Sequence, residues 1–180
     1  MIEYWYTDKL HKLFNKAKNL VENSLKIKLP EVKVYISTEK YLVEILTNIY
    51  FEKGYTKKKA QKMAVKQAKF IRGLYIRKKK TIFLKEDVGE NLQTLVHELL
   101  HVVQKCDRSP IRKEKIVVFL TYLILKDRFE HDCLTRKIVE EWQRKISNKS
   151  VEIVKRRLLQ EGIATIFRLT FTYHVYMWSQ

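Results

Sequence analysis

The chain has 180 residues, of which 46% are hydrophobic and 32% charged, and this composition excludes a disordered or fibrous protein. Only four Gly and two Pro are present, which favours long helices with short connections over a many-turned β-sandwich. The formal net charge is +17, and a positive field of this size attracts polyanions and acidic partners without by itself identifying a nucleic-acid binder.

The first half of the chain alternates predicted helices with short predicted strands. Apolar residues recur at helical spacing near the N-terminus, alternate in a strand after Pro30, and return to helical spacing after the capping residues Ser37 or Thr38 and Thr56. The expected helices cover 4–25, 38–53 and 56–70, and the expected strands cover 32–37, 73–77 and 81–85. The last two strands are expected to pair antiparallel through a basic turn.

The second half is predicted to be mostly helical. Asp87 and Glu90 resemble a capping box, so a helix should begin just after Asp87 and run to about Lys105. Pro110 is expected to open a long apolar helix that ends at Phe129. Two more helices are expected, at about 134–146 and from near 150 past 161.

These elements predict an α+β fold with a small N-terminal mixed or antiparallel sheet, an active-site helix and a mostly helical C-terminal half. We expect one domain over 1–180, with an α/β half at 1–106 and a helical half at 107–180.

Cysteine usage and hydropathy predict a cytoplasmic protein without a membrane span. The start of the chain lacks a basic segment followed by an apolar run, as a signal peptide would have. The longest apolar run, Ile116 to Leu125, is too short to cross a bilayer. Cys106 and Cys133 cannot form a disulfide framework, and both are expected to be small buried hydrophobes in a reducing setting.

The strongest motif is HExxH at His97, Glu98 and His101. Within a helix, four residues span slightly more than one turn, so the two imidazoles project from one face and can share a metal ion. Glu98 lies about 100° round the helix, where it can reach a water at the metal without ligating the metal. The competing interpretation, two histidines that face solvent on an amphipathic helix, conflicts with the apolar residues on both sides of the motif.

Two segments together resemble the zincin metallopeptidases, and more closely the gluzincins. The first is HELLH after a short strand, and the second is the downstream sequence Glu161-Gly162-Ile163-Ala164, which is similar to the EGxA segment of many gluzincins. The resemblance implies a zincin-like fold and implies that Glu161 is the third zinc ligand. The chain departs from a pattern found in some gluzincins at Thr165, where they have an acidic residue.

The surroundings of Glu161 can be judged without the resemblance. On a helical wheel Glu161 shares an apolar stripe with Val154 and Leu158, and a carboxylate there is costly unless it is charge-paired or bound to metal. An ion pair with Arg157 or Arg168, at the margins of the stripe, is the competing account.

Several other residues are weaker candidates. Tyr173 and His174 are candidates for an oxyanion or substrate contact, although a core aromatic cluster explains them more simply. Four other side chains are alternative candidates for the third ligand: His131, Asp132, Asp107 and Glu140.

We therefore expect a zinc-dependent peptidase that acts on a peptide or protein substrate. Zn²⁺ would be held by His97, His101 and Glu161, with Glu98 as the general base. The strand from Thr81 to Leu84 would pair with an extended substrate. The alternative is a basic nucleic-acid-associated protein or regulator, either a protease acting on DNA-bound proteins or a degenerate zincin, although no helix-turn-helix, zinc-finger or RRM signature is present. A purely structural zinc site is disfavoured, because it has no use for Glu98.

Overall fold

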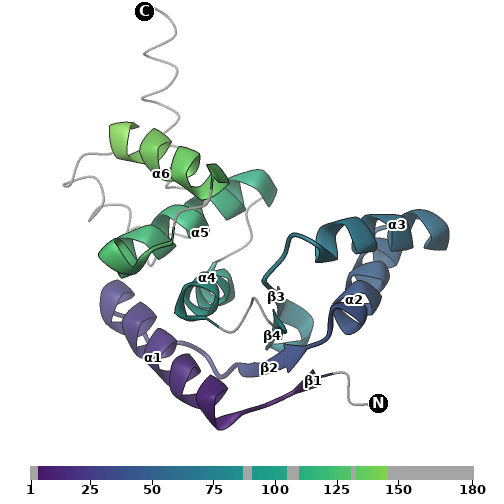
Figure 1. Cartoon of the computed structure of the whole chain (residues 1–180), viewed down its shortest axis with the longest axis horizontal. Coiled ribbons are helices and arrows are strands. Elements are labelled where there is room, and N and C mark those ends of the chain that lie inside the picture. The colour runs from purple at the N-terminus through teal and green to yellow at the C-terminus, as the bar shows by residue number, and fades with distance from the viewer. Residues whose placement is uncertain (1–3, 87–90, 105–109, 131–132, 146–180) are drawn as a thin grey trace, which may run out of the picture. The chain divides into compact units, whose positions relative to one another are not determined.

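The computed structural model describes residues 4–86, 91–104, 110–130 and 133–145. The chain forms two compact units, one of residues 1–19 and 30–102 and the other of residues 20–29 and 103–180. The predicted α+β class is confirmed: the first unit holds a four-stranded sheet, and the remainder of the described chain is mostly helical (Figure 1).

The sheet has the strand order β1-β2-β4-β3 and is mixed, as predicted. Its strands are β1 (Tyr4–Trp5), β2 (Lys33–Ser37), β3 (Gly73–Ile76) and β4 (Thr81–Lys85). β2 pairs parallel with β4, whereas β1 and β3 are antiparallel to their neighbours. β4 is therefore an interior strand, and β3 is an edge strand of the described sheet.

The N-terminal segment differs from the prediction of one helix from residue 4. Tyr4 and Trp5 instead pair with β2, and helix α1 (Asp8–Leu25) begins three residues later. The Thr7 hydroxyl oxygen accepts a hydrogen bond from the Leu10 N–H at 3.0 Å, which caps the first turn. The helical spacing of apolar residues lies within α1, whereas Tyr4 and Trp5 are held in a strand by their pairing with β2.

Helices α2 (Glu39–Glu52) and α3 (Lys57–Ala68) begin where their capping residues predict. The hydroxyl oxygens of Thr38 and Thr56 accept hydrogen bonds from backbone N–H groups three residues on. Gly54, with φ of +88°, makes the turn between the two helices in a conformation that favours glycine.

The core of the first unit lies on both faces of the sheet. Phe83 on one face packs with Leu42 and Ile45 of α2, together with the partly buried Leu74 and Ile76 of β3. Side chains alternate along a strand, so Gly73, Ile82 and Leu84 point to the opposite face. On that face, a Cβ added at Gly73 would contact side chains of helix α4 (Leu92–Val103), which lies beside the sheet (Figure 1).

Helix α4 begins later than the capping-box prediction. Asp87 and Glu90 lie outside the described residues, and the described helix starts at Leu92. The side-chain oxygen of Asn91 accepts a hydrogen bond from the Thr94 N–H at 2.7 Å, so Asn91 caps the first turn.

The second unit contains α5 (Pro110–Leu125) and α6 (Cys133–Lys145). α5 begins at Pro110 as predicted but ends at Leu125, because Lys126 adopts a left-handed φ of 48° and a single 3-10 turn follows. Phe119 of α5 packs against Trp142 of α6, with ring centroids 5.3 Å apart. Among the described helices, none combines the length and apolar character needed to span a bilayer. The helix predicted from residue 150 lies outside the described residues.

Candidate metal centre

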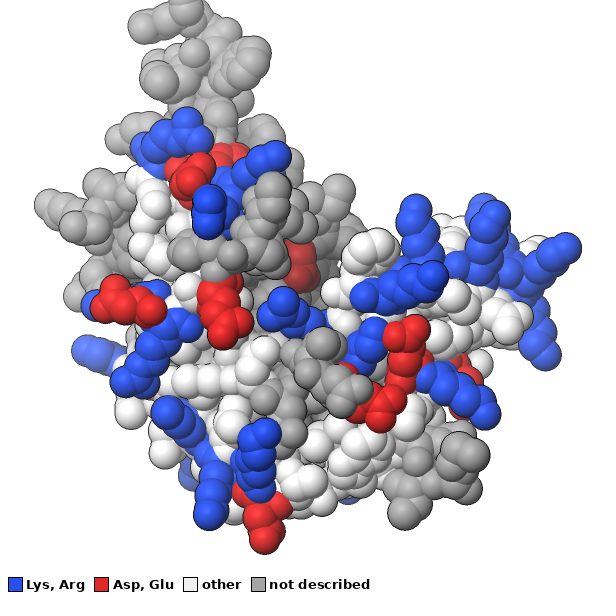
Figure 2. Space-filling view, viewed as in Figure 1, with Lys and Arg blue, Asp and Glu red and all other residues white. Residues whose placement is uncertain are grey.

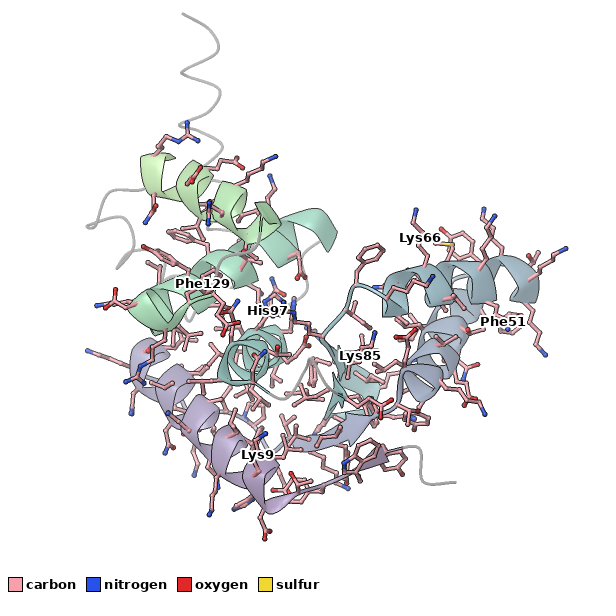
Figure 3. The ribbon with its side chains drawn as sticks, in the orientation of Figure 1. Lys9, Phe51, Lys66, Lys85, His97 and Phe129 are labelled. Carbon is pink, nitrogen blue, oxygen red and sulfur yellow. The ribbon has the colours of Figure 1, made fainter. Side chains whose placement is uncertain are left out.

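Helix α4 has one polar, partly exposed stripe, and the apolar residues at its centre are buried. Its apolar residues Leu95, Val96, Leu99 and Leu100 are at most 2% exposed. Gln93, His97 and His101 are only partly buried, and their four-residue spacing places them along one face. The helix therefore carries both histidines on one partly exposed face, as the HExxH spacing predicts, and His97 is labelled in Figure 3.

The two imidazoles point toward one another. Their Nε2 atoms are 3.2 Å apart, and the ring centroids are 4.9 Å apart with the ring planes at 72°. A zinc ion bound tetrahedrally at about 2.0–2.1 Å from each nitrogen requires the two nitrogens to lie about 3.3 Å apart. The separation thus fits two ligands of one ion. A hydrogen bond between the rings is the alternative, in which only one of the two Nε2 atoms carries a proton.

Glu98 lies beside the histidine stripe, buried against the edge of the sheet. It is 6% exposed, and Thr94, one turn earlier, is also 6% exposed. A Cβ placed on Gly73 of β3 would lie 2.9 Å from both Cγ and Oε1 of Glu98, and 3.0 Å from Cγ2 of Thr94. The Glu98 side chain can therefore occupy this position only because residue 73 is a glycine.

Three features lie together in the first unit: the convergent imidazoles of His97 and His101, the buried carboxylate of Glu98 and the adjacent edge strand β3. The chain matches no protein family model, no curated protein and no solved structure. The resemblance to zincins consequently stays an expectation from the two motifs.

His97, Glu98 and His101 lie among the described residues, on one helix as predicted. Glu161, Tyr173 and His174 lie outside the described residues, as do His131, Asp132 and Asp107. Glu140 is an exposed residue of α6. Sequence reasoning overlooked Gly73, although a glycine inside a predicted strand is a known sign of close approach by another group.

One predicted role of the sheet was wrong. β4 was expected to pair with substrate, but it has β2 on one side and β3 on the other. The Lys85 N–H donates to the Arg72 carbonyl at 2.8 Å, and bonded pairs alternate along antiparallel strands. Gly73 and Tyr75 therefore direct their backbone N–H and C=O groups away from β4. β3 is also the strand whose Gly73 lies against the Glu98 side chain.

Substituting Gly73 with alanine should disturb Glu98 directly. The added methyl group overlaps the Glu98 side chain, so we expect a destabilisation of about 1–3 kcal/mol from overpacking, together with loss of any activity that depends on this carboxylate. Thermal unfolding and hydrolysis assays would measure the two effects.

The matched control is Gly54→Ala. It places a side chain in a left-handed conformation with no atom within 4 Å, so it should cost about 1–2 kcal/mol in stability through strain alone. Any activity that depends on Glu98 should survive in that variant. Equal activity of the two variants would show that Gly73 does not position Glu98.

Proposed function

We propose that the protein is a zinc-dependent peptidase that hydrolyses peptide bonds. The observation that carries the proposal is the 3.2 Å separation of the Nε2 atoms of His97 and His101 on one helix, with the buried Glu98 beside them. Two neutral nitrogen ligands and a neighbouring carboxylate suit zinc in a catalytic site, where an open coordination position is kept for water or substrate.

In this proposal His97 and His101 hold the metal, and Glu98 moves protons. A divalent zinc ion supplies Lewis-acid chemistry, since it polarises a carbonyl and lowers the pKa of a water molecule. The Glu98 carboxylate takes a proton from the attacking water and delivers it to the amine that leaves. Burial in a site of low polarity strengthens the electrostatic interactions of that carboxylate.

The edge of β3 supplies the binding surface for the substrate. An extended peptide that adds to this edge would pair with the outward backbone groups of Gly73 and Tyr75. Its chain would then run past Glu98, because Gly73 is in contact distance of that side chain. Recognition through backbone groups alone predicts broad tolerance of substrate side chains.

The third metal ligand comes from outside α4. The gluzincin resemblance favours Glu161. A carboxylate ligand suits zinc chemically.

An alanine variant tests this ligand. We expect Glu161→Ala to lose stoichiometric zinc after dialysis and Glu140→Ala, which removes an exposed carboxylate of α6, to keep it, as measured by elemental analysis. Equal zinc content in the two variants would contradict a site that uses Glu161.

Hydrolysis itself is tested with a peptide library and mass spectrometry. Cleavage should require zinc, stop when a chelator removes the metal, and return when zinc is added back. Metal-independent cleavage, or none by protein carrying stoichiometric zinc, would contradict the proposal.

A further inference from the structure

Most of the net positive charge of this protein lies in one segment. Residues 53–85 contain 11 Lys and 2 Arg and no Asp or Glu, so they carry 13 of the 17 net positive charges. The whole segment belongs to the first unit. The charge is therefore a local feature, although the basic residues of the chain as a whole are widely spread.

Helix α3 carries the densest part of this segment on one face. Its apolar stripe, Ala60, Ala64 and Ala68, is completely buried, and Ala64 and Ala68 pack with Leu46 of α2. At about 100° per residue, five lysines lie in an arc of about 100° on the opposite side of the helix. These exposed lysines are Lys58, Lys59, Lys62, Lys66 and Lys69, the last of which follows the helix end.

The charge on this face is not neutralised by neighbouring acidic groups. Within the described part of the chain, ion pairs of the basic segment include Lys78 with Glu52 and Lys85 with Glu39, and neither lysine belongs to α3. Lys59 instead lies over the ring of Tyr55, 5.0 Å from its centroid. In Figure 2 the blue side chains over α3 project into solvent with no red side chain among them.

We propose that this α3 face binds the phosphate backbone of nucleic acid. From Lys58 to Lys69 the face extends about 16 Å along the helix at 1.5 Å per residue. A duplex presents one phosphate charge per about 1.7 Å of its axis, so several phosphates can be reached at once. Phe70, 78% exposed and next to Lys69, offers a ring on which an unpaired base can stack.

An anionic membrane is a poorer partner for the same face. A helix that lies in a membrane interface inserts its apolar side among the lipids. The apolar side of α3 is the alanine stripe, which is already buried against α2. Lysine side chains contact phosphates without reading bases, so binding should be strong at low salt and indifferent to sequence.

The test compares Lys58→Gln, Lys62→Gln and Lys66→Gln together with a control of equal charge, Lys12→Gln, Lys16→Gln and Lys40→Gln. All six lysines are exposed residues of the first unit. Fluorescence anisotropy with labelled single-stranded and duplex DNA would be recorded from about 50 to about 200 mM salt. Exposed substitutions of this kind change stability by about 0.5 kcal/mol or less, which thermal unfolding would verify.

We expect the α3 variant to bind DNA at least about tenfold more weakly, with a log–log salt slope smaller by about 2.7, from 0.9 per lost phosphate contact. The control should stay close to wild type, and replacing the three α3 lysines with arginine should retain binding. Equal weakening in both triple variants would overturn the proposal, as it would show that net charge alone attracts DNA. Stronger binding to phosphatidylserine vesicles than to DNA at matched salt would also overturn it.

The proposal is independent of the peptidase activity. None of the three substituted lysines belongs to α4 or β3, so Zn²⁺ content and hydrolysis should not change in the α3 variant.

Discussion

Replacing either His97 or His101 with alanine is expected to abolish stoichiometric zinc binding. Each variant leaves one imidazole on α4, so affinity should fall at least about a hundredfold, since even outer-shell changes cost about ten- to a hundredfold. The stabilisation by zinc should vanish as well. A ligand at a hundred times its Kd stabilises the native state by about 2.7 kcal/mol. Competition with a chromophoric chelator measures affinity, and thermal unfolding with and without zinc measures the stabilisation.

His11→Ala is the matched control for these two variants. His11 is an exposed histidine of α1 that contacts Tyr6 and the side chain of Asn15. Removing it deletes an imidazole without touching α4, so zinc affinity should equal that of wild type. If His101→Ala bound zinc as tightly as His11→Ala, the two α4 imidazoles would not share an ion.

Replacing Glu98 with glutamine should leave zinc in place and remove hydrolysis. The two side chains have nearly the same shape, so the buried position between α4 and Gly73 accepts either. The amide cannot accept a proton from water, and general acid–base catalysis contributes about a hundred- to ten-thousandfold. We expect kcat to fall by about that factor with little change in KM. Steady-state kinetics on a cleaved peptide, with elemental analysis for zinc, measure both.

Glu44→Gln controls for the loss of one carboxylate. Glu44 is an exposed residue of α2, in the same unit as Glu98. Its substitution should change neither zinc content nor kcat. A Glu98→Gln variant as active as Glu44→Gln would refute the proposed role of Glu98 as general base.

Local sequence signals predicted which segments of the first unit are helical. They predicted less well where α1 and α4 begin. Thr38 and Thr56 mark the starts of α2 and α3 because a hydroxyl next to a helical period satisfies free N–H groups. Tyr4 and Trp5 escaped prediction because their strand exists only through pairing with β2, which lies about thirty residues away in the chain. The Asp87 and Glu90 pattern predicts a helix start before Asn91, whereas in the structure the side chain of Asn91 caps the described helix.

The same distinction holds for the candidate site: contacts between residues close in the sequence were predicted, and contacts between distant residues were not. His97, Glu98 and His101 lie within one helical turn and the next, so spacing alone predicts that the two imidazoles converge. Gly73 belongs to a strand distant in the sequence, and its contact with Glu98 depends on how β3 packs beside α4. The position of β4 inside the sheet likewise follows from parallel pairing with β2, which no local pattern encodes.

X-ray absorption spectroscopy of the zinc-loaded protein gives the most direct test of the shared ion. We expect two imidazole ligands per zinc, with nitrogen at about 2.0–2.1 Å, and one imidazole in His97→Ala loaded at saturating metal. A wild-type spectrum without imidazole scattering, or one unchanged by that substitution, would contradict the account.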